Sequence, residues 1–492
     1  MKKVLSVFLS CCMICTVIFV PGISAAGVNT RSLTVDGDSY PFILIRGVDF
    51  GAMSTDYGTP QQAPAVEAIT AGGIVMALLK AAGAGIVHGS FERAVDSLLD
   101  YADSILGKLS CDKDGASVYD LGLNRYPLSA ANYTEELITG GGRGAEEGIV
   151  KSAVERYGAD NVYYFTYDWR LNPLDICDEI NEMVTRATRE RGTAKVNLVC
   201  ASMGGIEAVA YLSKYGYEKI NTCVFLSSTF YGLYMVSDLF CGRVDVSDIA
   251  LYNFLADKTC GNALLNFALK TMKMTGLFRL VGSFAGRVIE EHKDSVYDGF
   301  IRDTLGTMPV WWSLVLPEDY EEAIQYMFGG HEEEYAGIIA LSRELQAMVA
   351  QRDALLKDAA ANGLQIAVVA NYNSPAMPLY ERALANSDGG LETALVSGGA
   401  TVAHYGTTLG ADYVPSNSVF LSPDRVIDAT TCLFPDSTWF VKDGGHVACS
   451  YASEYSDFLF WLVDFDRPTV FSDERYPQFL LSGSGETISK LQ

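Results

Sequence analysis

Apolar residues fall into two recurring patterns along the chain, short continuous runs and longer segments with helical spacing. The segments 145–158 and 174–191 have the periodicity of amphipathic helices. Continuous apolar runs typical of buried strands occur at 42–45, 161–170, 196–200 and 220–228. This alternation of helix and strand predicts an α/β fold with a mostly parallel sheet and crossover helices.

The alternation stops after residue 228. Residues 232–350 have a helical and irregular pattern, and a closing helix is expected at 452–465. Strand patterns return between these two segments, at 364–375, 418–423 and 437–443. The simplest account is a sheet core, formed by 27–231 and 351–492, that is interrupted by a large helical cap at 232–350.

The first 26 residues have the pattern of a secretory signal peptide. Lys2 and Lys3 precede an apolar run at 4–20, and small residues follow up to Ala26. The cysteines near this end lie inside the apolar run, which does not favour a lipoprotein. No later segment approaches the roughly 20 continuous apolar residues of a spanning helix. We therefore expect a signal peptide at 1–26 and a soluble, secreted mature protein.

The overall charge excludes one large class of partners. The chain has 36 Lys and Arg against 60 Asp and Glu, a formal net charge of −24. Because such a surface repels phosphate backbones, nucleic-acid binding is not expected.

The cysteines give no sign of a metal centre. No CxxC pair has a matching partner, so a zinc cluster is not expected. Cys200 and Cys223 lie in strand-like runs and are expected to be buried free thiols. Cys241 and Cys260 lie in one polar-flanked segment, where a disulfide and two free thiols are both open.

The stretch VNLVCASMGG passes from a predicted strand through Ser202 into a predicted helix. A serine at such a tight turn becomes a nucleophile when small residues two positions before and after it let the turn form. Here these positions are Cys200 and Gly204, so the GxSxG pattern is present with one departure. The alternative is an ordinary serine at the start of a buried helix.

The chain offers five candidate bases for this serine. Only His446 follows a late strand, in a glycine loop with a helix after it, and the alternative is a surface histidine. In α/β-hydrolases the triad order is serine, acid, histidine. The acid is expected after the preceding strand, where Asp412 is preferred over Asp424 and Asp428. Asp443 is interpreted as a loop residue.

The tetrahedral intermediate of an acyl transfer needs two backbone donors. One is expected from the residue after the nucleophile, Met203, and the other from the loop after an early strand. Val48 occupies that second place, just past Gly47, and Asp49 is expected to shape the loop.

These segments together resemble the lecithin:cholesterol acyltransferase-like lipases. PFILIRG is similar to the first strand and turn of that family, FTYDWRLNP to its YDWR segment, CASMGG to its GHSMGG elbow, and GADYVPSNS to its acid loop. The resemblance covers about 40–230 and 360–460 and little of the cap. It departs from the family at Arg46, at Cys200 and Ala201, and in an acid loop that is one residue shorter.

The resemblance implies an α/β-hydrolase fold and a set of site residues. The implied catalytic residues are Ser202, Asp412 and His446, with the backbone amides of Val48 and Met203 as the oxyanion hole. Asp168 and Arg170 of the YDWR segment are expected to pair and brace the sheet edge. No metal or organic cofactor is implied.

The cap contains a cationic amphipathic segment at 264–284, with Lys270, Lys273 and Arg279 among large apolar residues. It predicts a packed cap helix, and it also fits an acyl pocket or a transient contact with a membrane surface. Trp311 and Trp312 are candidates to line such a pocket.

These observations lead to one functional expectation and two alternatives. We expect a secreted serine hydrolase, a lipase, esterase or acyltransferase, that acts on carboxylic and particularly lipid esters through an acyl-enzyme. The alternatives are a catalytically silent relative that binds a lipid or peptide, and a serine peptidase on the same fold.

Overall fold

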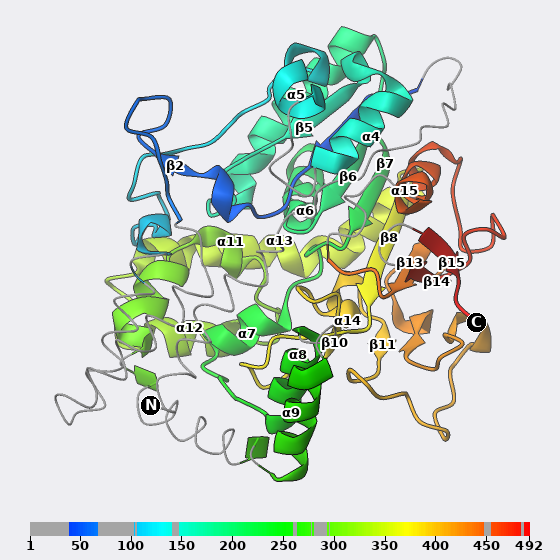
Figure 1. Ribbon diagram of the computed structural model, residues 1–492. Helices are drawn as coiled ribbons and strands as arrows, with labels where there is room; N and C mark the ends of the chain where they lie inside the picture. The colour runs from blue at the N-terminus through cyan, green and yellow to red at the C-terminus, as the bar shows by residue number, and fades with distance from the viewer. Residues whose placement is uncertain are drawn as a thin grey trace.

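The computed structural model describes most of the chain (Figure 1). The described residues are 39–66, 103, 106–139, 147–258, 263–276, 278–279, 293–294, 296–446, 454–483 and 487–492. The expected signal peptide at 1–26 lies outside them.

An eight-stranded sheet forms the centre of the molecule. From one edge to the other its strands are β15 (Thr487–Lys490), β14 (Phe479–Gly483), β13 (Thr438–Lys442), β8 (Gln365–Tyr372), β7 (Ile220–Leu226), β6 (Val196–Ala201), β1 (Phe42–Ile45) and β5 (Val162–Phe165). All neighbouring pairs are parallel except β14 with β15. The prediction of a mostly parallel α/β sheet is confirmed.

Helices cover both faces of this sheet, which is why its central strands are apolar on both sides. On one face α5 (Pro173–Arg191) packs against α6 (Gly204–Tyr215), and α13 (Ala336–Ala361) packs against α6. On the other face lie α4 (Glu147–Tyr157) and α15 (Glu454–Asp464).

Local sequence sets the ends of α5. The Asn172 side chain accepts a hydrogen bond from the Leu174 amide, and Pro173 occupies the first helical position. Gly192 ends the helix in the left-handed conformation, with φ 67°. The chain then turns directly into β6, the strand that leads to Ser202.

The chain between β7 and β8 is mainly helical. Its elements before α13 are α7 (Tyr234–Phe240), α8 (Asp248–Lys258), α9 (Ala263–Met274), the π-helix η6 (Tyr297–Leu305), α11 (Pro309–Trp312) and α12 (Tyr320–Phe328). Trp312 is fully buried, and its ring contacts the rings of Phe240 and Phe328. These contacts join α7, α11 and α12 to the main core, and the proposed domain boundaries at 231 and 350 stay predictions.

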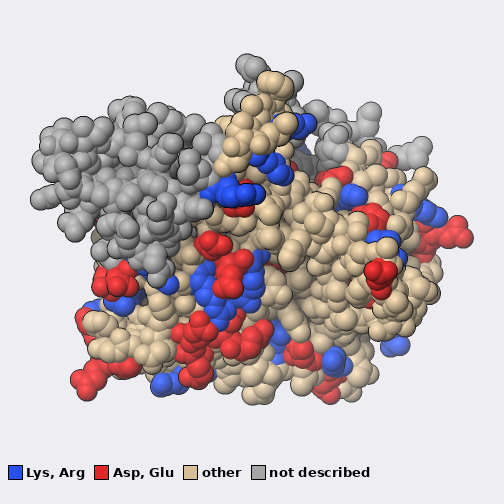
Figure 2. Space-filling view, turned by 90° about the horizontal axis from the view of Figure 1, so that it is seen from below, with Lys and Arg blue, Asp and Glu red and all other residues tan. Residues whose placement is uncertain are grey.

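Helices α8 and α9 belong to a second, smaller apolar cluster. Phe254 of α8 and Phe278 are buried there together with Met377 and Tyr380, and Leu269 and Met272 of α9 pack against it. In Figure 1 these two helices project away from the sheet. Figure 2 looks at the molecule from that end; Lys and Arg lie on the projecting part, and another group of them lies among acidic side chains in the middle of this face.

Short elements connect these larger ones. The minor strands are β2 (Ser54–Thr55), β3 (Ala63–Pro64), β4 (Leu121–Gly122), β9 (Ser374–Pro375), β10 (Asn386–Ser387), β11 (Thr401–Val402) and β12 (Ile427–Asp428). The short helices are η1 (Phe50–Ala52), η2 (Gly107–Leu109), η3 (Ala130–Asn132), η4 (Thr134–Thr139), η5 (Ala159–Asn161), α14 (Thr393–Val396), η7 (Ser418–Phe420), η8 (Ala429–Thr431) and η9 (Pro435–Ser437).

One expectation about the C-terminal half is wrong, and two strands there were not predicted. The segment 418–423 is not a strand of the sheet but begins with the 3₁₀ turn η7, which Asn417 caps by accepting from the Val419 amide. The strands β14 and β15 were not expected; β15 is mostly exposed and lacks an apolar run.

The structure describes three of the four cysteines that the sequence singled out. Cys200 and Cys223 are buried free thiols, as expected, with their Sγ atoms 3.9 Å apart. Cys241 is also a free thiol and contacts the Asp319 carbonyl at 3.4 Å, so the disulfide alternative for it is wrong. Cys260, its expected partner, lies outside the described residues.

Within the described ranges, every helix is too short or too polar to cross a membrane.

Candidate functional site

Ser202 lies on a strained turn between β6 and α6. Its φ of 50° is in the left-handed region, which a serine adopts at a cost of about 1–3 kcal/mol. Its amide donates to the Leu226 carbonyl at 3.1 Å and its carbonyl accepts from the Thr229 amide at 3.0 Å. The neighbouring strand end therefore holds the turn, and the half-buried Ser202 side chain stays reachable.

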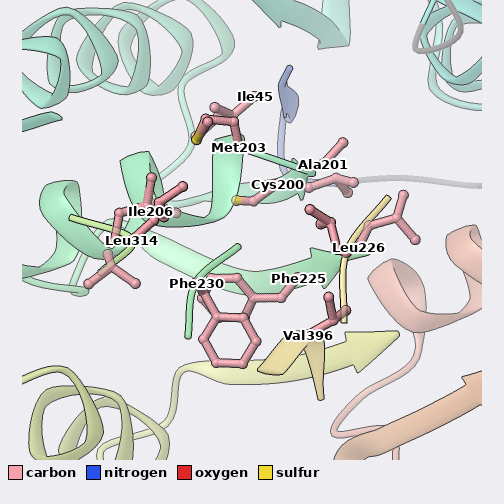
Figure 3. Packing of buried hydrophobic residues seen from close by; sticks show 14 of the residues in the cluster. Ile45, Cys200, Ala201, Met203, Ile206, Phe225, Leu226, Phe230, Leu314 and Val396 are labelled. Atoms are coloured by element: carbon pink, nitrogen blue, oxygen red, sulfur yellow. The ribbon is translucent and has the colours of Figure 1, made fainter. Parts of the chain in front are cut away.

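Two glycines allow this turn to pack closely. A Cβ on Gly204 would lie 2.5 Å from the Ile45 carbonyl oxygen, and a Cβ on Gly205 would lie 1.6 Å from Ser228 Oγ. Figure 3 shows the apolar packing around the turn, with Met203 and Ile45 on one side and Phe225 and Phe230 on the other. The start of α6 therefore lies directly against the end of β1.

His446 is in contact with this serine. Its Nε2 lies 3.0 Å from Ser202 Oγ, although the two residues are 244 positions apart. The imidazole comes from the loop after β13, in which Asp443 and Gly445 both have positive φ values. The structure thus brings together the serine and the histidine that the sequence singled out.

The carboxylate next to His446 is Asp388, not the expected Asp412. Asp388 Oδ2 lies 2.8 Å from His446 Nδ1. Its other oxygen accepts hydrogen bonds from the amides of Gly390 and Leu391, at 2.8 and 2.7 Å. The side chain of Asp388 is 1% exposed and that of His446 17% exposed. Burial and two amide donors fix the carboxylate, which in turn orients the imidazole.

The three acids that sequence reasoning considered lie elsewhere. Asp412 is exposed on the loop after β11. Asp424 accepts from Tyr372, Ser422 and Lys442; burial raises its pKa, but these hydrogen bonds outweigh that effect and lower it overall. Asp428 accepts from Tyr413 and from Thr430.

A local signal for Asp388 is present in the sequence. The expected position of the acid was the loop after the strand that precedes the histidine strand, and Asp388 lies there, after β8 and directly after β10. It is followed by Gly389 and Gly390, and Gly389 has φ 94°. An aspartate in a tight glycine turn can hold its own carboxylate with backbone amides, which Asp412 in an exposed loop does not.

Glu392 connects the loop that carries Asp388 to the helical segment between β7 and β8. Its buried Oε1 accepts from Tyr380 at 2.6 Å and from the Met235 amide in the first turn of α7 at 3.0 Å. Burial raises the pKa of Glu392, although these hydrogen bonds lower it in part. The loop that positions Asp388 is therefore tied to α7.

The two residues expected to donate amides to an oxyanion lie at the start of α6 and on the loop after β1. Met203 is the residue at the N-terminus of α6, where the first amides of a helix have no partner within the helix. Val48 is half-buried on the loop after β1. Asp49 shapes this loop by accepting from the Gly51 amide at 2.9 Å, and its carboxylate lies 3.5 Å from Arg46 Nη1.

The expected pairing of Asp168 with Arg170 is confirmed. The guanidinium donates to both carboxylate oxygens, at 2.9 and 2.6 Å, and the Arg170 side chain is fully buried. Arg170 also donates to the Leu109 carbonyl and to Ser117 Oγ. The pair therefore ties the end of β5 to the segment 109–117.

The contacts of Ser202, His446 and Asp388 together suit one kind of chemistry, proton transfer from a hydroxyl to an imidazole. Ser202, His446 and Asp388 form a continuous hydrogen-bonded row, the arrangement that lets an imidazole take a proton from a hydroxyl while a carboxylate supports the imidazolium. Among the described residues, no group of three or more His, Cys, Asp or Glu is placed to hold a metal ion.

No protein-family model and no curated protein matches the chain. The assignment of a function therefore depends on the geometry of the site itself.

An apolar cavity lies between α7 and α11. It is lined by Met235, Val236, Leu239, Phe240, Leu305 and Trp311. Trp312 does not line it; its ring is fully buried elsewhere in the core, and its Nε1 donates to the Gly306 carbonyl at 2.7 Å. Of the two tryptophans expected at an apolar pocket, Trp311 is the one that reaches this cavity.

Proposed function

We propose that the protein is a secreted serine hydrolase that cleaves carboxylic esters through an acyl-enzyme. The observation that carries the proposal is the row formed by Ser202 Oγ, His446 and Asp388, with contacts of 3.0 and 2.8 Å. The left-handed backbone at Ser202 supports it, because strain of this kind persists where the surrounding structure needs a residue in one place.

The reaction would proceed in two halves. His446 Nε2 takes the proton of Ser202 as Oγ forms a bond to the carbonyl carbon of the ester, and the protonated imidazole then gives this proton to the leaving alkoxide. In the second half, water or another alcohol loses a proton to His446 and attacks the acyl carbon, and His446 returns this proton to Ser202 Oγ as the bond between the acyl carbon and Oγ breaks. Asp388 orients the imidazole and stabilises its charged form in both halves.

The developing oxyanion would be held by the amides of Met203 and Val48. The close contact of Gly204 with the Ile45 carbonyl supports this assignment, because it keeps the start of α6 and the loop after β1 together.

The strand order supports an α/β-hydrolase fold within the broader α/β class. The serine follows β6, the acid follows β8 and the histidine follows β13, which is the chain order of that fold. In this proposal the helical segment between β7 and β8 is the cap. The resemblance of the YDWR and SMGG segments to lecithin:cholesterol acyltransferase-like lipases makes a lipid ester the preferred substrate and leaves both hydrolysis and acyl transfer open.

The surface of α9 supports a substrate held at a lipid surface. Phe267 and Met274 are 71% and 88% exposed, and Lys270 lies on the same helical face. Leu269 and Met272 on the opposite face pack into the second apolar cluster. A cationic helix with exposed large apolar residues, on a protein of net charge −24, suits an anionic lipid surface.

The proposal is tested by hydrolysis of p-nitrophenyl esters across acyl lengths, with the Ser202→Ala variant beside the wild type. We expect activity with the wild type, greater for longer chains, and its loss in the variant. A fluorophosphonate should label Ser202, which mass spectrometry of the peptide would locate.

A matched control separates loss of the nucleophile from general damage. Ser374→Ala changes another partly buried serine after β8 and should keep full activity. If wild type and Ser202→Ala are equally inactive on all esters and Ser202 stays unlabelled, the protein is not a serine hydrolase and a binding role takes its place. Cleavage of peptides in preference to esters would instead assign a peptidase.

A further inference from the structure

The side chain of Asn371 makes three hydrogen bonds at the end of β8. Its Nδ2 donates to Ser227 Oγ at 3.0 Å and to the Gly445 carbonyl at 2.5 Å, and its Oδ1 accepts from the Tyr455 hydroxyl at 2.5 Å. Asn371 is 1% exposed. Both amide protons and the amide oxygen are therefore used inside the protein.

One of these bonds seats the loop that carries His446. Gly445 directly precedes His446 and has φ 67°. The preceding Gly444 lies so close to the amide that a Cβ there would be 2.6 Å from Asn371 Oδ1. The conformation of the last two residues before His446 is thus set against the Asn371 side chain.

The second donor bond reaches the serine side of the site. Ser227 has φ 42°, a left-handed value, and it directly follows Leu226, whose carbonyl accepts from the Ser202 amide. Two strained serines therefore end the neighbouring strands β6 and β7, and the Asn371 amide contacts one of them. A single side chain links the support of Ser202 to the loop of His446.

We infer that Asn371 is a positioning residue that fixes the His446 imidazole relative to Ser202. A role of Asn371 in catalysis rests on the proposed function. Its role in positioning the imidazole does not depend on that function. The role requires an amide: an aspartate of nearly the same shape has no donor when ionised and would set a charge against the Gly445 carbonyl.

The decisive variant is Asn371→Asp, with Asn221→Asp as its matched control. Asn221 lies on the adjacent strand β7, and its amide also donates twice, to Asn197 and to Thr222. It lies near the start of β7, whereas Asn371 lies near the end of β8. Tyr455→Phe removes only the hydroxyl that orients the Asn371 amide, and it serves if Asn371→Asp does not fold.

The primary measurement is NMR of the full chain with isotope-labelled histidine, in which His446→Gln identifies the His446 ring signals. We expect Asn371→Asp to shift or broaden these signals, Tyr455→Phe to shift them less, and Asn221→Asp to leave them unchanged. Unchanged His446 signals in a folded Asn371→Asp or Tyr455→Phe protein would overturn the inference.

The rate of fluorophosphonate labelling separates this inference from the proposed function. We expect Asn371→Asp to lower the labelling rate at least tenfold, and kcat for esters to fall with little change in KM. If the wild type is not labelled, the proposed function fails, but the NMR result still decides whether Asn371 positions His446. Wild-type labelling with an equal rate in Asn371→Asp would count against the positioning role and leave the function standing.

Discussion

Asp388 contacts His446 Nδ1 with one carboxylate oxygen and two backbone amides with the other. The carboxylate is therefore held from its own loop before it meets the imidazole. This arrangement fixes both the position of His446 and the nitrogen that carries its proton, which is the task of an acid in a serine triad.

Replacing Asp388 by asparagine should reduce ester hydrolysis by roughly 10³–10⁴-fold, because an amide favours the wrong tautomer of the histidine. Asp412→Asn and Asp424→Asn are the comparisons, and both should keep activity within about a fewfold of the wild type. The measurement is kcat on one p-nitrophenyl ester at neutral pH. A large loss in Asp412→Asn with an active Asp388→Asn would restore the assignment made from the sequence.

Glu207 should make the protein less stable as the pH rises. Its carboxyl is fully buried in α6, both oxygens lack a hydrogen-bond partner, and burial raises its pKa well above 4.5. The contribution of the protonated group is fully present below the unfolded pKa. Between that value and the folded pKa it is lost at about 1.4 kcal/mol per pH unit, because only the unfolded chain ionises.

Glu207→Gln removes this titration. Urea denaturation at pH 5 and pH 8 should therefore show nearly equal stabilities of the two proteins at the lower pH and a more stable variant at the higher pH. A gap that is the same at both values would contradict a neutral Glu207 in the folded protein.

The two glycines after Met203 should respond differently to alanine. In Gly204→Ala the new Cβ meets a backbone carbonyl, so the variant should lose about 1–3 kcal/mol and part of its activity. In Gly205→Ala the nearest atom is Ser228 Oγ, a side-chain atom, and Ser228→Ala should recover most of the loss. Thermal unfolding of the single and double variants measures this, and failure of Ser228→Ala to rescue would place the clash elsewhere.

The exposed face of α9 should bind anionic vesicles. Phe267→Ser with Met274→Ser should weaken sedimentation with phosphatidylglycerol vesicles at least fivefold and leave phosphatidylcholine binding low throughout. The control is Val414→Ser with Val419→Ser, since these apolar residues are 84% and 60% exposed on another surface. All proteins would carry Ser202→Ala so that vesicle binding is measured without turnover. Equal losses in both double variants would mean that exposed apolar surface in general, not α9, causes the binding.

Much of the core could be predicted because its signal is local. The strands β1, β6, β7 and β8 are largely apolar runs. Ser202 follows β6 two residues before Gly204, and His446 follows β13 directly after Gly445. The run at 418–423 misled for a physical reason: Val419 is 60% exposed, so its hydrophobicity does not reflect burial. The strand β15 is an exposed edge and has no such pattern.

The acid illustrates what local reasoning misses. Asp388 lies 58 residues before His446, and the intervening chain holds the other candidates Asp412, Asp424 and Asp428. The glycine turn after Asp388 is a local signal for a held carboxylate, but the packing of the loop after β8 brings that carboxylate to the imidazole. The resemblance in the exposed segment GADYVPSNS pointed to Asp412, whereas the carboxylate that contacts His446 is Asp388.

The contact of Glu392 with the first turn of α7 limits how freely this protein can be recombined. Removal of the helical segment would take away the Met235 amide and leave a buried carboxylate with one fewer donor, four residues from Asp388. The helical segment is thus not an interchangeable module. A chimera that exchanges it for the corresponding segment of another protein would need to carry a matching residue at position 392.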